Sequence, residues 1–398
     1  MIGWARVLLL ALGLAMPATA LAQSETSWSA EAYGSAGWSA NPFVGSGDAS
    51  SGFVQFGLRP KARIRTERDT IDIAADIQVQ QYFRRYSTRD NYNVRFNYTG
   101  KPNERITTRL GVRYANTIAG AFFDGSSIAD PGTPVSPDQV PDIGLFGTNN
   151  RRQSIDLQPG VDIRLSARDQ LQFTSFVTTT TNSGSQQANN FFSYGGSLGY
   201  ANRLSSRATV GVEAAASAAD YRGGLGSTRV YSVRGTADLV LTERWKLTGA
   251  AGASFLDTGL ANLSGARPSS ATVSGRLSLC NTGALDTFCL VASRDVAPSN
   301  FAGTSAQSSI TASYRRRVSR YGNVSIQSSF TDIELGQLQL PGTATRYWAS
   351  SGEYRYALGE RLSVTASGFY RAVLGGIANR GDDYGGQIGF VYRFGDLR

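Results

Sequence analysis

Residues 53–80 read FVQFGLRPKARIRTERDTIDIAADIQVQ, and apolar side chains recur at every second position on both sides of the polar pair Glu67-Arg68. The apolar series is Val54, Phe56, Leu58, Ala62 and Ile64 before the pair and Ile71, Ile73, Ala75, Ile77 and Val79 after it. A period of two that persists over about ten residues indicates a β-strand rather than a helix. The stretch therefore predicts a hairpin of two long strands joined by a tight turn.

The same alternation continues from residue 27 to the end of the chain. It predicts 18 strands, at 27–39, 53–66, 70–83, 91–100, 105–116, 153–165, 170–181, 191–201, 206–218, 229–241, 246–256, 271–280, 288–295, 308–318, 323–331, 346–358, 361–372 and 383–395. The connections alternate between short turns, such as Gly359-Glu360, and longer segments rich in Gly, Ser and Asn. Short periplasmic turns and longer extracellular loops are typical of an antiparallel, up-and-down transmembrane β-barrel.

A soluble, secreted all-β protein is the alternative, because its strands also alternate. The uniform strand length favours the membrane, since soluble strands average about five to six residues. The apolar face also carries aromatic residues near the strand ends, which predict two interfacial girdles. These are Trp28, Trp38, Tyr92, Tyr98, Tyr114, Tyr200, Tyr231, Phe255, Phe330, Trp348, Tyr356, Tyr370 and Tyr384. We expect the barrel to lie in the lipid of the bacterial outer membrane.

Residues 1–22 have the pattern of a secretory signal peptide. Arg6 supplies the positive region, an apolar run follows to Met16, and Ala20-Leu21-Ala22 forms an A-x-A cleavage site. No later apolar run approaches the ~18 residues of a membrane helix. The predicted organisation is a signal peptide over 1–22 and an outer-membrane barrel over 23–398.

The composition argues against an enzyme. The chain has no His and two Cys, which removes His-based general bases and metal sites and any four-thiolate zinc site. No phosphate-binding Gly loop or calcium motif is present, so we expect no catalytic residue, metal or cofactor. The net charge is +9 and 36 of the 39 basic residues are Arg. Their positions map to the barrel interior rather than to an exposed stripe, which argues against nucleic acid as a partner.

If the apolar positions face lipid, the alternate positions line the lumen. This inward series contains 15 cations, a basic track of Arg59, Lys61, Arg63, Arg65, Arg95, Arg109, Arg113, Arg164, Arg234, Arg276, Arg315, Arg317, Arg355, Arg371 and Arg393. The inward acids are Glu31, Asp72, Asp76, Asp156, Asp162, Glu213, Asp238 and Glu353. The lumen therefore carries a net charge of about +7, and such a field concentrates anions inside a low-dielectric wall.

Part of this basic track is expected to form ordinary cross-strand ion pairs. The turn at Glu67-Arg68 sets a register in which Arg63 faces Asp72 and Arg59 faces Asp76, while Lys61 and Arg65 have no acid directly opposite on the next strand. The five-residue turn after Gly100 is expected to place Arg95 close to Arg109. Roughly half of the cations are thus predicted to be structural, and the unpaired remainder to form a conduit for anions.

The segment 117–152 is the longest connection. It contains Phe122, Phe123 and Phe146 and four acids, Asp124, Asp130, Asp138 and Asp142. One interpretation is a constriction or lid that folds into the pore, its acids drawn to the basic wall, and the other is a solvated external loop.

Cys280 and Cys289 flank the turn between the twelfth and thirteenth predicted strands and both take inward positions. A hairpin brings such positions together, and the exported chain passes through an oxidising compartment. The sequence predicts a disulfide between them.

Three short stretches resemble the β-barrel porin-2 type of outer-membrane protein. They are Asn41-Pro42-Phe43, then Ser51-Gly52-Phe53-Val54 leading to Arg59-Pro60, and Tyr82-Phe83-Arg84-Arg85-Tyr86. The resemblance implies a role alongside exopolysaccharide biosynthesis, as an outer-membrane conduit for a secreted polymer. The architecture is also similar to that of the alginate-export porin. By that analogy the chain needs a separate periplasmic export partner.

Three functions follow as hypotheses. The first is export of an acidic exopolysaccharide through the Arg-rich lumen, in which successive carboxylates exchange between Arg side chains. The second is passive diffusion of small anionic solutes. The third is a non-conducting adhesin or structural barrel whose external loops bind partners.

Overall fold

The computed structural model describes residues 25–45, 50–84, 86–118, 150–183, 190–222, 226–258, 269–299, 303–335, 345–375 and 381–396. The predicted signal peptide over 1–22 and residues 119–149 of the longest connection, the candidate lid or external loop, lie outside these ranges. Within the described ranges, no helix has the length and hydropathy needed to cross a bilayer.

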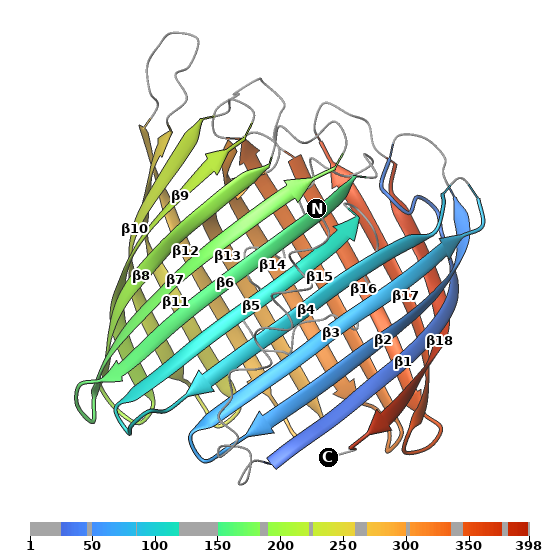
Figure 1. The fold of residues 1–398 in the computed structure, drawn as a ribbon, viewed down its shortest axis with the longest axis horizontal. Helices are drawn as coiled ribbons and strands as arrows, with labels where there is room; N and C mark the ends of the chain where they lie inside the picture. Colours follow the sequence, from blue (N-terminus) through green and yellow to red (C-terminus); the bar gives the residue numbers. More distant parts are fainter. Residues whose placement is uncertain are drawn as a thin grey trace, which may run out of the picture.

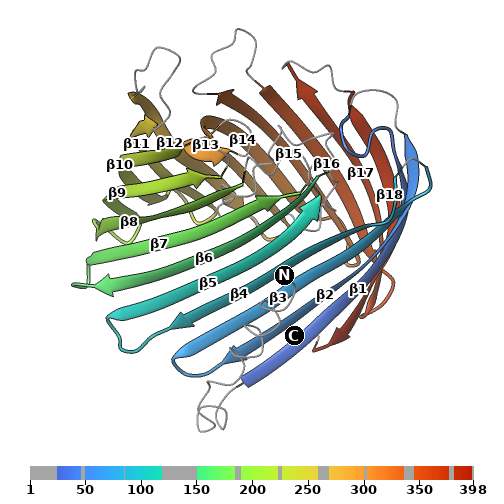
Figure 2. The same cartoon turned by 45° about the horizontal axis from the view of Figure 1, so that its top comes forward.

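The described chain forms a closed barrel of 18 strands (Figures 1 and 2). Each strand pairs with the next one in sequence, and the first pairs with the last to close the barrel. The strands are β1 (Glu25–Ser39), β2 (Ser51–Arg65), β3 (Asp69–Tyr82), β4 (Arg89–Gly100), β5 (Ile106–Ile118), β6 (Arg151–Arg164), β7 (Asp169–Asn182), β8 (Phe191–Arg203), β9 (Ala208–Tyr221), β10 (Ser227–Val240), β11 (Trp245–Thr258), β12 (Ser269–Thr282), β13 (Asp286–Ser299), β14 (Gly303–Arg317), β15 (Gly322–Leu335), β16 (Thr345–Ala357), β17 (Leu362–Leu374) and β18 (Asp383–Gly395). β1 pairs antiparallel with both β2 and β18, which removes the sheet edges. The predicted fold class is confirmed.

The outer surface of the barrel is apolar. Val273 is 71% exposed, Ile388 68% and Phe56 60%, and each alternates along its strand with inward polar residues. Large aliphatic side chains at such exposure belong in lipid rather than in water. A closed barrel satisfies its backbone hydrogen bonds internally, as a bilayer requires. These features place the protein in the bacterial outer membrane, with the short turns on the periplasmic side.

The predicted aromatic girdle lies on this outer face. Trp28, Trp38, Trp348 and Tyr384 are all exposed there. Several of its tyrosines are anchored at the strand ends by carboxylates: the Tyr98 hydroxyl donates to Asp69 over 2.9 Å. Amphipathic rings of this kind sit at the level of the lipid headgroups.

The strands run further toward the extracellular side than the alternation predicts. β13 ends at Ser299 and β14 begins at Gly303, whereas the sequence pattern places the ends at 295 and 308. β15 likewise continues to Leu335, beyond the predicted end at 331, and its outward Glu334 pairs with Arg294 near the end of β13 at 2.8 Å. Backbone pairing continues above the bilayer, but the outer face no longer has to be apolar, so the alternation disappears first.

The register of the first hairpin agrees with the prediction, with Arg63 opposite Asp72. The prediction that Arg95 lies close to Arg109 is wrong, because Arg95 stands opposite Arg113. The side chain of Asn103 accepts hydrogen bonds from the backbone of Arg105 and Ile106, both at 2.9 Å. This Asx turn lengthens the connection and shifts β5 by four residues relative to β4.

Cys280 and Cys289 stand directly opposite each other on β12 and β13 and form a disulfide. The ladder between these strands begins at Gly275 on β12, although β12 itself starts at Ser269. The bond therefore joins two strands that pair over only part of their length.

Replacing both cysteines by serine should lower the free energy of unfolding by about 2–3 kcal/mol, because the bond closes a short loop of the unfolded chain. The check is the temperature at which the barrel loses its folded mobility on gels, with and without reductant. Wild type and the C280S/C289S variant should coincide under reduction. Two free thiols, found by mass analysis of the alkylated exported protein, would contradict the disulfide.

Candidate functional site

All 15 cations of the predicted basic track occupy inward positions in the barrel wall. The alternation in each strand places them on the face opposite the lipid-exposed hydrophobics, as with Arg59, which reaches Asp76 while Phe56 and Leu58 of the same strand are exposed on the outer face. The eight predicted acids lie on the same inner face. These cations fall into two groups, according to whether each forms an ion pair with a carboxylate.

Seven of the fifteen form ion pairs with carboxylates among the described residues. The pairs are Arg59–Asp76 at 3.1 Å, Arg63–Asp72 at 2.5 Å, Arg109–Asp162 at 2.6 Å, Arg234–Asp295 at 2.5 Å, Arg355–Glu353 at 3.4 Å, Arg393–Glu31 at 2.9 Å, and Arg371–Asp383. Five of them join neighbouring strands, including β1 with β18 at the closure, while Arg234–Asp295 reaches from β10 across to β13 and Arg355–Glu353 lies within β16. These cations are part of the wall's own structure.

Three further cations form a row across one wall near the middle of the strands. Lys61 and Arg95 both stand opposite Ala74 of β3, one on each side of it, and Arg95 stands opposite Arg113 of β5. None of the three has an ion-pair partner among the described residues, and the buried Nε of Arg113 also lacks a hydrogen-bond partner there. We call Lys61, Arg95 and Arg113 the cationic row.

The cationic row has the properties of an anion site. Neighbouring strands lie about 4.8 Å apart, so directly opposite arginines repel each other unless an anion lies between them. Ion pairs border the row toward both ends of the strands, at Arg59–Asp76 and Arg109–Asp162. The carboxylate directly opposite Arg113 is Asp156 of β6, which is buried and accepts a hydrogen bond from Thr178 over 2.8 Å. Guanidinium groups bind carboxylate and phosphate through two parallel hydrogen bonds. A barrel of this strand number has room for an aqueous channel along such a wall.

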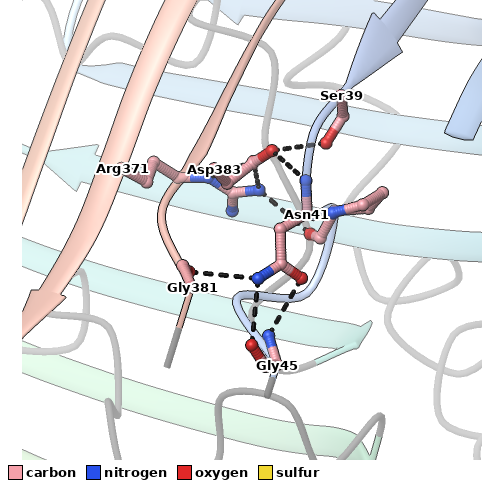
Figure 3. A network of polar contacts seen from close by, with 7 residues as sticks. Ser39, Asn41, Gly45, Arg371, Gly381 and Asp383 are labelled. Carbon is pink, nitrogen blue, oxygen red and sulfur yellow. Dashed lines mark hydrogen bonds and ion pairs between the residues drawn. The ribbon is translucent and has the colours of Figure 1, made fainter. Parts of the chain in front are cut away.

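A buried polar network lies on the inner wall at the extracellular ends of β1, β17 and β18 (Figure 3). Arg371 pairs with Asp383 and also donates to the carbonyl of Pro42 over 2.9 Å. The second oxygen of Asp383 accepts from the Ser39 hydroxyl at 2.5 Å and from the Asn41 backbone at 2.9 Å. Both charged side chains are almost completely buried, so Arg371 belongs to this network and is not an exposed part of the basic track.

This network fixes residues 41–45, which we call the inner strap. The Asn41 side chain bonds to the carbonyls of Gly45 and Gly381, both at 3.0 Å. Phe43 packs with Phe53, Tyr82 and Ile118 in one cluster, and the fully buried Val44 packs with Ile333, Tyr347 and Val373 in another. Val44 also has a φ of 52°, an unfavourable backbone conformation for a β-branched residue. The strap thus joins the inner walls on both sides of the barrel's closure.

Sequence reasoning missed several members of these interactions. Asp295 pairs with Arg234, and Lys246 lies 4.0 Å from Asp238. The missed residues Asp295 and Lys246 have inward parity, so extending the alternation over the full length of their strands would have found them. The role of Asp383 had no such signal, because it depends on contacts between residues more than 300 positions apart. No described residues gather into a group of three or more potential metal ligands.

No protein-family model matches the chain, and no curated protein matches it. Solved outer-membrane structures are similar in shape. Pseudomonas aeruginosa OccK2 in complex with glucuronate matches with a TM-score of 0.46 and 13% identity, covering 93% of this chain and 98% of that one. OpdK of Pseudomonas aeruginosa gives 0.45 and 12%, covering 94% and 99%. The Acinetobacter baumannii siderophore receptor PirA gives 0.46 and 8%, covering 93% and 80%. Similarity at this level says nothing about which solute this lumen admits.

Proposed function

We propose that the protein is an outer-membrane channel through which small anionic solutes diffuse. The observation that carries the proposal is the cationic row, in which Arg95 directly opposes Arg113 and neither has an ion-pair partner among the described residues. Keeping like charges this close costs free energy. An anion that lies between the two arginines offsets that cost. We therefore expect the favourable free energy of anion binding to be largest at the cationic row.

The remaining wall supports the same function. The paired cations supply rigidity, and the excess of unpaired cations gives the lumen a positive potential that raises the local concentration of anions. Each contact is made in a wet lumen and is worth about 1 kcal/mol or less, which allows rapid release. The role of the basic track in conduction is part of this proposal.

A matched set of solutes built on the same six-carbon chain tests the proposal. In proteoliposomes, gluconate should enter fastest, neutral sorbitol more slowly and cationic N-methylglucamine slowest, with about a tenfold difference between the two charged solutes. Size and flexibility are nearly equal across the set, so charge determines the order. Equal rates for gluconate and N-methylglucamine would contradict an anion channel.

Export of an acidic exopolysaccharide is a second candidate, supported by the resemblance of the three short stretches and by the unpaired arginines at the periplasmic mouth described below. Deletion of the gene, followed by measurement of polymer outside the cell and in the periplasm, tests it. Loss outside with retention inside would support export and a periplasmic export partner. Unchanged secretion would leave the diffusion channel. A non-conducting adhesin predicts no solute uptake in the proteoliposomes and unchanged polymer secretion after the deletion.

A further inference from the structure

The short turns at the periplasmic end share a repeated design. Thr66-Glu67-Arg68, Ser166-Ala167-Arg168, Ser205-Ser206-Arg207 and Thr242-Glu243-Arg244 each place a hydroxyl residue two positions before an arginine, and Asn103-Glu104-Arg105 is analogous. In every case the side-chain oxygen accepts from the arginine backbone, as Ser166 does from Arg168 at 3.0 Å. Gly359-Glu360-Arg361 ends the same way without the cap. Six turns thus carry an arginine at the same place, and in five of them a side-chain cap fixes its backbone.

The backbone of each of these arginines is held at the rim by the next hairpin. The carbonyl of Arg68 accepts from Lys101 at 2.9 Å and that of Arg168 from Arg203 at 2.8 Å, and Arg105, Arg207, Arg244 and Arg361 accept in the same way. Each of these bonds extends the backbone pairing between adjacent hairpins by one residue. The alternation of the strand that follows each turn places its arginine at an inward position.

Strand ends add further cations beside these turns. Arg65, Arg164, Arg203 and Arg317 are the last residues of their strands on the inner face. We call the ten arginines 65, 68, 105, 164, 168, 203, 207, 244, 317 and 361 the periplasmic arginine ring. All ten are exposed, and none has an ion-pair partner among the described residues.

Most acids of this rim are placed away from the ring, and the exception is Glu25 of β1, which stands opposite Arg65. Asp69 and Asp169 take the outward parity, where they accept from the girdle residues Tyr98 at 2.9 Å and Tyr200 at 2.5 Å. Glu67, Glu104, Glu243 and Glu360 occupy the turn positions just before the arginines, and none of them comes within ion-pair distance of a described cation. Positive charge therefore surrounds the mouth while part of the negative charge faces the lipid interface.

We propose that the periplasmic arginine ring is a binding site for multivalent soluble anions, from which they enter the lumen. The inference rests on the proposed anion channel and adds a substrate class and a loading site to it. A single charge is held weakly by an exposed arginine, because water and salt screen the contact. An anion with several charges engages several arginines at once, and its second and third contacts form at high effective concentration. Arg65 and Lys61 lie four residues apart on the inner face of β2, with Arg63 between them, so the ring leads into the cationic row.

Inorganic tripolyphosphate, titrated calorimetrically into the barrel in neutral detergent, tests the ring. It should bind at least about tenfold more tightly than monovalent acetate, and the affinity should fall with added salt. The variant R68Q/R168Q/R244Q/R361Q should bind tripolyphosphate at least about tenfold more weakly. The matched control E67Q/E104Q/E243Q/E360Q changes the same number of charges in the neighbouring turn positions and should bind no more weakly than wild type.

Three results would overturn the ring as a site: no tripolyphosphate binding by wild type, unchanged affinity in the arginine variant, or equal loss in the glutamate control. Repeating the titration in phosphatidylglycerol nanodiscs separates soluble anions from lipid headgroups, because binding that disappears there assigns the ring to lipid phosphate. Chloride selectivity of the same variants, measured in bilayers, keeps the two proposals distinct. Retained selectivity without tripolyphosphate binding removes the ring alone, and absent selectivity in wild type removes the channel.

Discussion

Changing Arg95 and Arg113 together to glutamate should reverse the ion preference of the channel. The double substitution shifts the charge of the cationic row by four units, at a point where Asp76 and Asp162 are already paired and Asp156 stands opposite residue 113. In a low-dielectric wall this reverses the sign of the local potential. The reversal potential across a bilayer with a KCl gradient should change sign, and the ratio of chloride to potassium permeability should fall at least about tenfold.

The control for this experiment is R229E/R346E. Both arginines lie on the outer face near the extracellular ends of β10 and β16, and Arg346 is 3.6 Å from Asp332 there. The variant changes the net charge by the same amount without touching the lumen, so its reversal potential should stay close to that of wild type. A conducting R95E/R113E channel with unaltered selectivity would show that the cationic row does not line the ion path.

Replacing Asp383 by alanine should produce the largest loss of stability among single substitutions in the barrel. It leaves Arg371 charged, buried and without its carboxylate, and it removes the acceptor of Ser39 and of the Asn41 backbone. Breaking a buried ion pair from one side costs about 3–5 kcal/mol. The temperature of the heat-induced mobility shift on gels should fall accordingly, and the free energy of unfolding in urea should confirm the size of the loss.

Asp72→Ala is the matched comparison, because it breaks an ion pair that is well exposed, with Arg63 at 63% and Asp72 at 38%. An exposed pair contributes about 0–1 kcal/mol, so this variant should unfold almost like wild type. The Asp383 variant should also release the inner strap, which is expected to increase the noise and size of single-channel currents. Equal stability of D383A and D72A would contradict a structural role for the network.

The strands could be predicted from sequence because the bilayer imposes the alternation directly on them. A strand such as β3 cannot place Asp72 or Asp76 in lipid, so its parity follows from the positions of its charges. The same constraint explains why the inward orientation of Arg95, Arg113 and Lys61 could be assigned without a structure. Where the wall rises above the bilayer the constraint ends, and the extracellular extensions of β13 and β14 leave no trace in the pattern.

Partners across the lumen wall were harder to predict than orientation. The register between β4 and β5 depends on one local hydrogen-bonded turn at Asn103. The predicted register was wrong by four residues, so it placed Arg109 rather than Arg113 beside Arg95. The buried network could not be predicted from the sequence, for a different reason. Arg371 has the same inward parity as the exposed cations, and only the approach of Asp383 and Pro42 from distant parts of the chain makes it structural.

The reversal potential of the wild-type channel in a KCl gradient is the most direct test of the central claim. A channel lined by the cationic row should pass chloride in preference to potassium, so the reversal potential should lie toward the chloride equilibrium potential, and the preference should weaken as salt rises. A reversal potential at zero, or one displaced toward potassium at low salt, would contradict an anion channel.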